Sequence, residues 1–306
     1  MADALRQLQG SMIESVEVIT NPSARYEAEG EAGIINIVLK KENQLGVNGS
    51  FEVSGGYPHN YGASYNLNLR RKKVNLFSSY GINYNKRPGE GYIERYVTRD
   101  TVFHDRTNRN HTRGGLSTHI SLGADVFFSP KDVLTFSGLY KYGNGNNLTK
   151  LTYTNFDTLN NVIGNTYRQD NENEKENNIE ANVSYRKKYD EKDREWNTNL
   201  NFNLSDDTEN SNISQNSIPS ETSSNTEDEW NLLFQSDYVQ PFGINGKFEM
   251  GLKSTLRDID NDFSVSEPNR LAVIDSLSDK FTYRESITAG YLMAGNKTGQ
   301  FSYQGA

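Results

Sequence analysis

The stretch WNTNLNFNL, residues 196–204, constrains most strongly what this chain can fold into. Asparagine occupies every second position from Asn197 to Asn203, and the positions between them are mainly large and apolar. Successive side chains of a β-strand point to opposite faces, so this alternation predicts a strand with one apolar and one polar face. A hydrophobic content of 34% with 11% aromatic residues fits an ordered chain in which each strand has a single apolar face.

The same alternation recurs from residue 46 onward. We predict strands at 46–57, 61–71, 73–86, 114–128, 132–143, 177–189, 195–205, 228–239, 246–257 and 281–293, and an eleventh that begins near 299. Every second connection is short, whereas those at 87–113, 144–176, 206–227 and 258–280 are long and polar. Long strands joined by turns at one end and by loops at the other are typical of an outer-membrane β-barrel. A β-sandwich is the alternative, although its strands usually have about 5–6 residues.

A barrel explains the polarity of the two faces. A sheet that spans lipid must close on itself because no water can satisfy open backbone groups, and its outer face must be apolar. The asparagines at 197–203 would then line the interior. Tyrosines near the strand ends would form aromatic girdles at the two membrane interfaces. These tyrosines are Tyr57, Tyr61, Tyr84, Tyr140, Tyr142, Tyr189, Tyr238 and Tyr291.

The first forty residues follow another pattern. SMIESVEVIT and GIINIVLKK predict two short strands, the second apolar on nearly every position, as in strands buried on both faces. Asn21-Pro22 indicates a turn, because proline lacks an amide donor and restrains the residue before it. Gly30 and Gly33 allow a tight backbone path into the second strand.

The stretch IESVEVITNPSARYEAEGEAGIINIVLKK resembles the end of the plug domain of TonB-dependent outer-membrane receptors. That family has approximately I-E-x-I-E-V-I-x-G-P-x-S-x-x-Y-G, a loop of small residues, and then G-G-V-I-N-I-I-T-K. Asn21 replaces the usual glycine, and EAEGEAG replaces the small-residue loop. The positions that match are Ile13, Glu14, Glu17, Val18, Ile19, Pro22, Tyr26, Gly33, Ile35, Asn36, Ile37 and Lys40, and Gly30 belongs to the same plug motif.

The resemblance implies a plug that fills a barrel of 22 strands in the outer membrane of a Gram-negative bacterium. We therefore expect an all-β, antiparallel, partial barrel of about 10–11 strands at 45–306, preceded by the C-terminal remnant of a plug at 1–44. The chain would be a fragment cut at both ends, with open sheet edges that favour aggregation. The implied partners are outer-membrane lipid, a TonB-type energy-coupling protein that acts through the missing N-terminal part, and a small nutrient ligand of unknown identity.

Bulk properties exclude several classes of function. The chain has no cysteine, so disulfides and thiolate chemistry are unavailable. Its 40 acidic and 32 basic residues give a net charge of −8, which argues against a nucleic-acid partner. No apolar run reaches the length of about 18 residues that a transmembrane helix needs, and MADALRQLQG lacks the apolar core of a secretory signal.

Two groups of residues could bind metal but match known sites poorly. Asp258, Asp260 and Asp262 alternate as at the start of a calcium loop, yet Phe263 replaces the required glycine and Glu267 falls two positions short of the closing ligand. His104, His111 and His119 lie within sixteen residues without the spacing of a known ligand pair. We therefore expect solvated or interior-facing side chains, with no catalytic, cofactor or metal site and no enzyme activity.

Three functions are compatible with these features. The first is uptake of a metal chelate, glycan or peptide, with ligand contacts in the four long connections. The second is a non-transporting barrel with a role in adhesion or envelope structure. A soluble β-rich carbohydrate-binding protein is the third. The sequence upstream of this chain would separate the first two, and extraction would test the third.

Overall fold

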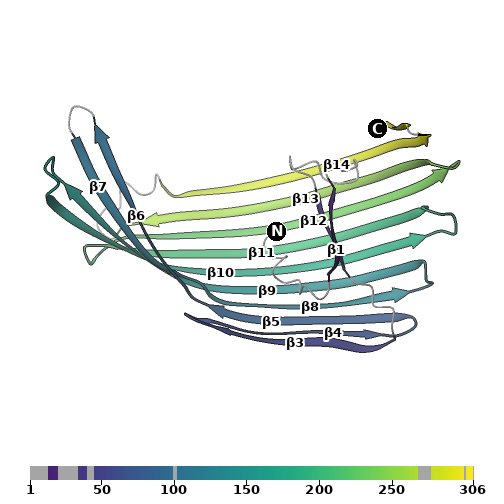
Figure 1. Ribbon diagram of the computed structural model, residues 1–306, viewed down its shortest axis with the longest axis horizontal. Coiled ribbons are helices and arrows are strands. Elements are labelled where there is room, and N and C mark those ends of the chain that lie inside the picture. The colour runs from purple at the N-terminus through teal and green to yellow at the C-terminus, as the bar shows by residue number, and fades with distance from the viewer. Residues whose placement is uncertain are drawn as a thin grey trace.

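The computed structural model describes residues 13–19, 34–39, 45–98, 102–267, 277–299 and 301–305. The regular elements in these ranges are β-strands (Figure 1). No helix in them is long and apolar enough to cross a membrane.

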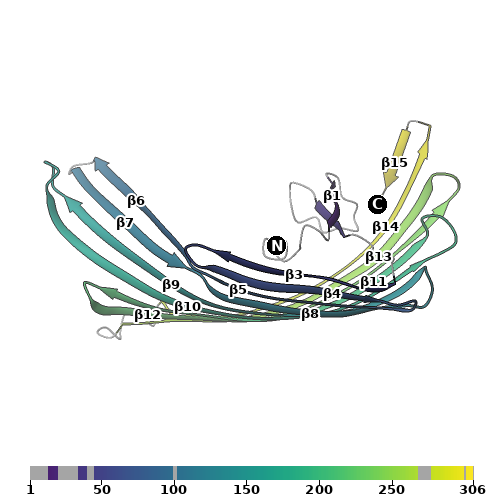
Figure 2. The same cartoon turned by 60° about the horizontal axis from the view of Figure 1, so that its bottom comes forward.

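Two short strands come first and form a sheet of their own. β1 (Ile13–Ile19) pairs antiparallel with β2 (Ile34–Leu39), so that Glu17 stands opposite Asn36. This confirms the two strands predicted for the first forty residues. Figure 2 shows the hairpin on the concave side of the large sheet, with whose strands it has no backbone pairing among the described residues. Pro22, Tyr26, Gly30, Gly33 and Lys40 lie outside the described residues.

The large sheet contains thirteen strands. They are β3 (Gly46–Gly56), β4 (Asn60–Arg70), β5 (Val74–Asn85), β6 (Arg87–Thr98), β7 (Val102–Arg113), β8 (Gly115–Phe127), β9 (Asp132–Phe156), β10 (Val162–Lys188), β11 (Glu195–Gln215), β12 (Ile218–Phe242), β13 (Gly246–Ser266), β14 (Asp279–Thr298) and β15 (Phe301–Gly305). Eleven of them follow one another as antiparallel neighbours from β3 through β4, β5 and β8 to β15. The sheet curves strongly but stays open, with β3 and β15 at its edges (Figure 2).

The hairpin β6–β7 continues the hairpin β5–β8 beyond the rest of that part of the wall. Tyr84 pairs with Leu116 and Arg87 pairs with Arg113, so one register runs through the break between them. Gly114 sits at this break with φ of 124°, which strongly favours glycine. β7 then pairs with the distal half of β9, while β6 has no other partner strand in the described sheet.

The predicted strand positions are confirmed, but the four long connections were predicted wrongly as loops. Residues 87–113 contain β6 and β7, and most of 144–176 and 206–227 extends β9 to β12. In 258–280, β13 continues to Ser266 and β14 begins at Asp279, while 268–276 lie outside the described residues. The extensions of β10, β11 and β12 are mainly polar on both faces and lack alternation, so pairing with neighbouring strands, not a local pattern, makes them strands. The turn between β11 and β12 consists only of Asn216 and Ser217, with φ of 51° and 66°, as a type I′ hairpin turn requires.

The sheet is a single layer without an ordinary hydrophobic core. In the described part of the chain the buried apolar side chains are Val133, Ile213 and Met293. A β-sandwich would pack a second sheet against the apolar face, so that alternative is wrong. The fold class is therefore all-β and antiparallel, as predicted for a partial barrel.

Candidate functional site

The two faces of the sheet differ in chemistry as the alternation predicts. On β11, Leu200 and Phe202 lie on the outer, convex face and are 40% and 38% exposed. The asparagines that alternate with these apolar residues lie on the inner face and form hydrogen bonds with asparagines of β10. Asn182 donates to Asn199, and Asn178 donates to Asn203, each at 2.8 Å between nitrogen and oxygen. The inner face of β10 and β11 is thus lined by hydrogen-bonded asparagines, and the outer face requires an apolar surrounding.

The outer apolar belt has the length of a membrane-spanning strand. On β11 it runs from Trp196 to Leu204. A transmembrane β-strand, which crosses the bilayer at a tilt, needs about 9–11 residues. Beyond Leu204 the outward positions become polar, beginning with Asp206 and Thr208.

Aromatic side chains mark the two borders of this belt. At the short-turn end, Tyr185 contacts Trp196 and Tyr189 contacts Tyr238, both edge to face, with ring centroids 5.6 and 6.3 Å apart. At the opposite border Tyr61 pairs with Tyr84, and both are exposed on the outer face. Such rings suit the interface between lipid and water.

Tyr291 departs from the predicted girdle. Its hydroxyl donates to Asp237 over 2.6 Å on the inner face, where Asp237 is only 5% exposed. The register of β14 therefore turns this tyrosine inward, and its prediction as a girdle residue is wrong.

The inner face of the projecting strands carries many carboxylates. Pairing between β10 and β11 places Glu174 opposite Glu209 and Glu176 opposite Asp207, and pairing with β12 places Asp207 opposite Glu227. Partial desolvation raises the pKa of Glu174, and the adjacent Glu172 raises it further. Burial, followed by the charges of Glu172 and Asp170, also raises the pKa of Glu209. This part of the wall favours protons or cations over anions.

Asn147 connects three strands of the projecting region and was missed by the sequence analysis. It is 8% exposed, accepts a hydrogen bond from the Gly114 amide at 3.0 Å and donates to Glu172 at 2.5 Å. Lys141 forms an ion pair with Glu176 at 2.6 Å on the same face. Through Asn147, the break at Gly114 between β7 and β8 is connected to Glu172 on β10. This connection depends on the register between distant segments, so the sequence alone does not show it.

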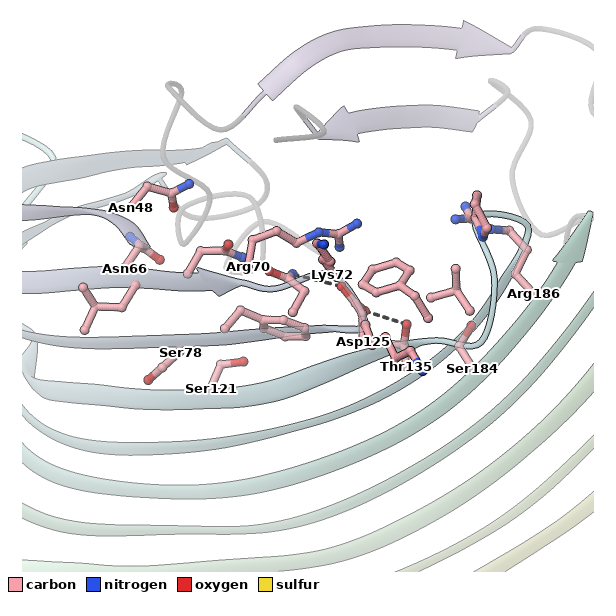
Figure 3. A pocket seen from close by; sticks show the side chains of 18 of the residues that line it. Asn48, Asn66, Arg70, Lys72, Ser78, Ser121, Asp125, Thr135, Ser184 and Arg186 are labelled. Atoms are coloured by element: carbon pink, nitrogen blue, oxygen red, sulfur yellow. Dashed lines mark hydrogen bonds between the residues drawn. The ribbon is translucent and has the colours of Figure 1, made fainter. Parts of the chain in front are cut away.

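A basic cavity lies at the other end of the inner face, near the short turns. It encloses about 1520 Å³ and is bordered by β3, β4, β5, β8, β9, β10 and β11 (Figure 3). Five cationic side chains line it, whereas its one lining carboxylate, Asp125, already accepts hydrogen bonds from Asn75 at 3.0 Å and Thr135 at 2.7 Å. The cations are Arg70, Lys72, Lys73, Arg186 and Lys188.

The aspartates considered for calcium lie on a strand, not in a loop. Asp258, Asp260 and Asp262 are outward positions of β13 and contact β14. Arg284 donates to Asp258 at 2.8 Å, Lys280 donates to Asp262 at 3.0 Å, and Thr282 donates to Asp260. Among the described residues no group of three or more histidine, cysteine, aspartate or glutamate side chains has the geometry to hold a metal ion.

The three histidines do not meet. His104 on β7 is stacked between Tyr96 and Phe156, with centroids 4.1 and 4.2 Å away, and is 7% exposed. Its Nδ1 lies 3.2 Å from Asn160 Oδ1. His111 packs over Gly89, and His119 over Gly81, at other levels of the sheet. His104 therefore anchors the tip of the β6–β7 hairpin to β9.

One family model matches the second part of the wall. Residues 187–305 match the model of an outer membrane protein beta-barrel family. This match agrees with the predicted outer-membrane β-barrel over that stretch, and together with the apolar belt it places the chain in the outer membrane of a Gram-negative bacterium. A search of curated proteins gives no match.

Two solved structures are similar in shape at low sequence identity. The ferric yersiniabactin uptake receptor FyuA from Yersinia pestis is 14% identical, with a TM-score of 0.49 and coverage of 94% of this chain and 50% of that one. The ferric citrate transporter FecA, in its unliganded form, is 9% identical, with a TM-score of 0.42 and coverage of 96% and 48%. The chain spans about half the length of these proteins.

Proposed function

We propose that the chain is part of a TonB-dependent-type receptor that takes up a nutrient across the outer membrane. Residues 1–44 would be the end of the plug and residues 45–306 the first half of the barrel. The observation that carries the proposal is the separate β1–β2 hairpin on the concave side of an outer-membrane wall. The plug-like motif falls on this hairpin, and two of its residues, Glu17 and Asn36, pair across it.

The inner face supports passage of a polar cargo. Within the belt, β10 and β11 line it mainly with asparagine and serine, together with Glu180, and charged side chains lie above and below the belt. The projecting hairpins β9–β10 and β11–β12 would meet the ligand first, and the plug would rearrange under the action of an energy-coupling protein. No catalytic step belongs to this proposal, and the ligand class is a metal chelate, glycan or peptide.

An uptake measurement in whole cells tests the function. Cells with and without the full-length gene would be offered labelled metal chelates, oligosaccharides and peptides, with and without a protonophore that collapses the inner-membrane potential. We expect one class to accumulate only with the gene and an energised membrane. Equal accumulation of every class in both strains would refute the proposal.

The second candidate is a non-transporting barrel for adhesion or envelope structure. It is favoured by the length of β9 and β10, which have 25 and 27 residues and extend far beyond the apolar belt. Loss of surface attachment or envelope integrity on gene deletion, without any change in uptake, would support it.

A further inference from the structure

His104 connects the tip of the β6–β7 hairpin to the neighbouring strand and to its turn. The imidazole is 7% exposed and is stacked between the Tyr96 ring on β6 and the Phe156 ring on β9. Its Nδ1 lies 3.2 Å from Oδ1 of Asn160, which belongs to the β9–β10 turn. Figure 2 shows this hairpin projecting beyond the strands β3 to β5. Three segments of the projecting region thus meet at one titratable ring.

The hydrogen-bond pattern defines which nitrogen of the neutral ring carries the proton. The amide oxygen of Asn160 can only accept a hydrogen bond, so Nδ1 of His104 is the donor. In a neutral imidazole Nε2 is then a bare acceptor. Within the described residues Nε2 is buried and has no hydrogen-bond partner. Oε1 of Glu94, another acceptor, lies 3.9 Å away. The neutral ring therefore leaves a buried acceptor unsatisfied beside a carboxylate.

A proton on Nε2 removes this conflict. Protonated histidine is a donor at both ring nitrogens, so Nε2–H can form a charge-assisted hydrogen bond with Glu94 after a small side-chain movement. The faces of the Tyr96 and Phe156 rings also attract the imidazolium, with ring centroids 4.1 and 4.2 Å away. These contacts replace the hydration that burial removes. They exist only while the tip is closed, so the closed tip binds the proton more strongly than an open one.

The charged groups around His104 leave Glu94 as its partner. Arg106, on the same strand, lies 4.0 Å from the same Glu94 oxygen, so it holds the carboxylate near the ring and also competes for it. Asp157, at the beginning of the β9–β10 turn, accepts hydrogen bonds within that turn. The other charged pair of the tip lies on the opposite face of the strands and consists of Arg95 and Asp105.

We propose that His104 is a proton-operated latch, which fixes the tip of the β6–β7 hairpin against β9 more tightly in acid than at neutral or alkaline pH. Histidine changes its charge between about pH 5 and 8. Because closing the tip takes up a proton, the stabilisation is fully present in acid and is lost as the pH rises through this range. The inference goes beyond the proposed uptake function and does not rest on it.

The protonation of His104 can be measured directly in the full-length protein in lipid vesicles. Isotope labelling of histidine nitrogens resolves the ring atoms by solid-state NMR, and the signal lost in His104→Phe assigns them. We expect a proton on Nδ1 alone at about pH 8.5 and protons on both nitrogens at about pH 5. An Nε2–H tautomer at the higher pH, or a bare Nε2 at both, would overturn the proposal.

Backbone hydrogen exchange tests the latch itself. From about pH 8 to about pH 5.5, exchange at the distal ends of β6 and β7, corrected for its intrinsic pH dependence, should slow about fivefold, because a partly exposed charged hydrogen bond is gained. His104→Phe keeps an aromatic ring but cannot bind a proton, so its exchange should not respond to pH. Glu94→Gln keeps an acceptor without the charge and should lose most of the response.

Glu90→Gln is the matched control for the loss of a carboxylate. Glu90 lies on the same face of β6 as Glu94, but six residues from Tyr96 and its stacking partner His104. This variant should retain the full response. A response that survives His104→Phe, or that Glu90→Gln and Glu94→Gln reduce equally, would overturn the proposal.

A second comparison separates the latch from the carboxylates of the inner face. Burial raises the pKa of Glu174 and Glu209, so exchange in β10 and β11 also depends on pH. Glu174→Gln with Glu209→Gln should leave the response of β6 and β7 intact. Loss of that response in this variant would assign it to the inner carboxylates and overturn the proposal.

Two precautions keep these outcomes interpretable. The migration of unheated protein on a gel shows whether each variant retains its barrel, and His104→Gln replaces His104→Phe if that variant does not. Neither NMR nor hydrogen exchange requires uptake, so failure of the proposed transport function leaves both tests of the latch unaffected.

Discussion

The part of the wall inside the apolar belt and the part that projects beyond it are built from the same strands. β11 keeps one register against β10 from Glu195 to Gln215, and its inward positions are polar from Glu195 to Ser211. Only the outward positions change, from Leu200 and Phe202 to Asp206 and Asn212. The membrane border is therefore encoded on the outer face, while pairing with neighbours determines where the strands end.

The largest expected effect is a loss of stability when a charge is placed on the outer face inside the belt, compared with the same change beyond it. Leu200→Arg places a charge in the middle of the belt and should destabilise the full-length protein in lipid by about 2–4 kcal/mol. Asn212→Arg, an outward position of the same strand beyond the belt, should change the unfolding free energy by less than about 0.5 kcal/mol. Denaturant unfolding in lipid vesicles measures both. Equal losses would place Asn212 inside the membrane and contradict the comparison.

The next effect concerns close packing inside the belt. A Cβ atom on Gly123 would lie 2.1 Å from the Phe77 ring and 2.8 Å from the Phe136 carbonyl oxygen. Gly123→Ala must displace that ring and should cost about 1–3 kcal/mol. Gly138→Ala is the matched control, because its nearest neighbour would be 3.6 Å away. Denaturant unfolding in lipid vesicles compares the stability of the two variants. An unchanged unfolding free energy for Gly123→Ala would show that the Phe77 ring moves aside without cost.

A pH change should act on the projecting region alone. Partial burial and neighbouring carboxylates raise the pKa of Glu174 and Glu209 above the usual 4.5. Their folded forms therefore hold protons that the unfolded chain releases, so ionisation opposes the fold, and acidification from about pH 7.5 to about 5 should stabilise this region. Backbone hydrogen exchange, corrected for its intrinsic pH dependence, should slow in the distal halves of β10 and β11.

Removal of the two carboxylates provides the control for this effect. Glu174→Gln with Glu209→Gln should slow exchange already at neutral pH and flatten the response. Asp157 at the tip of β9–β10 acts in the opposite sense, because hydrogen bonds from Asn161 lower its pKa below 3.8. Its stabilising contribution is present above pH 3.8 and is lost as the pH falls through the lowered value. Unchanged exchange protection of the distal halves of β10 and β11 between neutral and mildly acidic pH would argue against the pairing of Glu174 with Glu209.

The smallest effect is expected at the border itself. Arg284 and Asp258 form an ion pair of 2.8 Å on the outer face, with 76% of the arginine side chain exposed. Arg284→Ala should cost less than about 1 kcal/mol, and added salt should remove most of the difference. A larger loss that persists in high salt would place this pair inside the apolar layer and move the border outward.

The sequence predicts the belt well because its lipid-facing positions must alternate with interior ones. Leu200, Phe202 and Leu204 mark a strand without any tertiary information. Ser211, Asn212 and Ser214 carry no such signal, and their strand conformation comes from backbone pairing with β10 and β12. Polar sequences that are wet on both faces were therefore assigned wrongly as loops.

The candidate sites depend on register and so could be predicted only in part. The asparagine-lined interior follows from alternation. The basic cavity joins Arg70 to Arg186 across four pairings, which place Asn75, Asp125, Thr135 and Ser184 in one row. The stack of His104 between Tyr96 and Phe156 likewise needs the alignment of β7 with β6 and β9. No local pattern contains these alignments.

The length of the β9–β10 hairpin determines what can touch this surface. From Tyr142, near the border, to Phe156 at the tip there are fourteen steps, or about 46 Å along the strand. A folded domain of 100 residues has a radius of gyration of only about 13 Å. A whole protein, antibody fragment or virus fibre can therefore contact the tip while remaining clear of the lipid. Large particles and small solutes would therefore meet this chain at different heights.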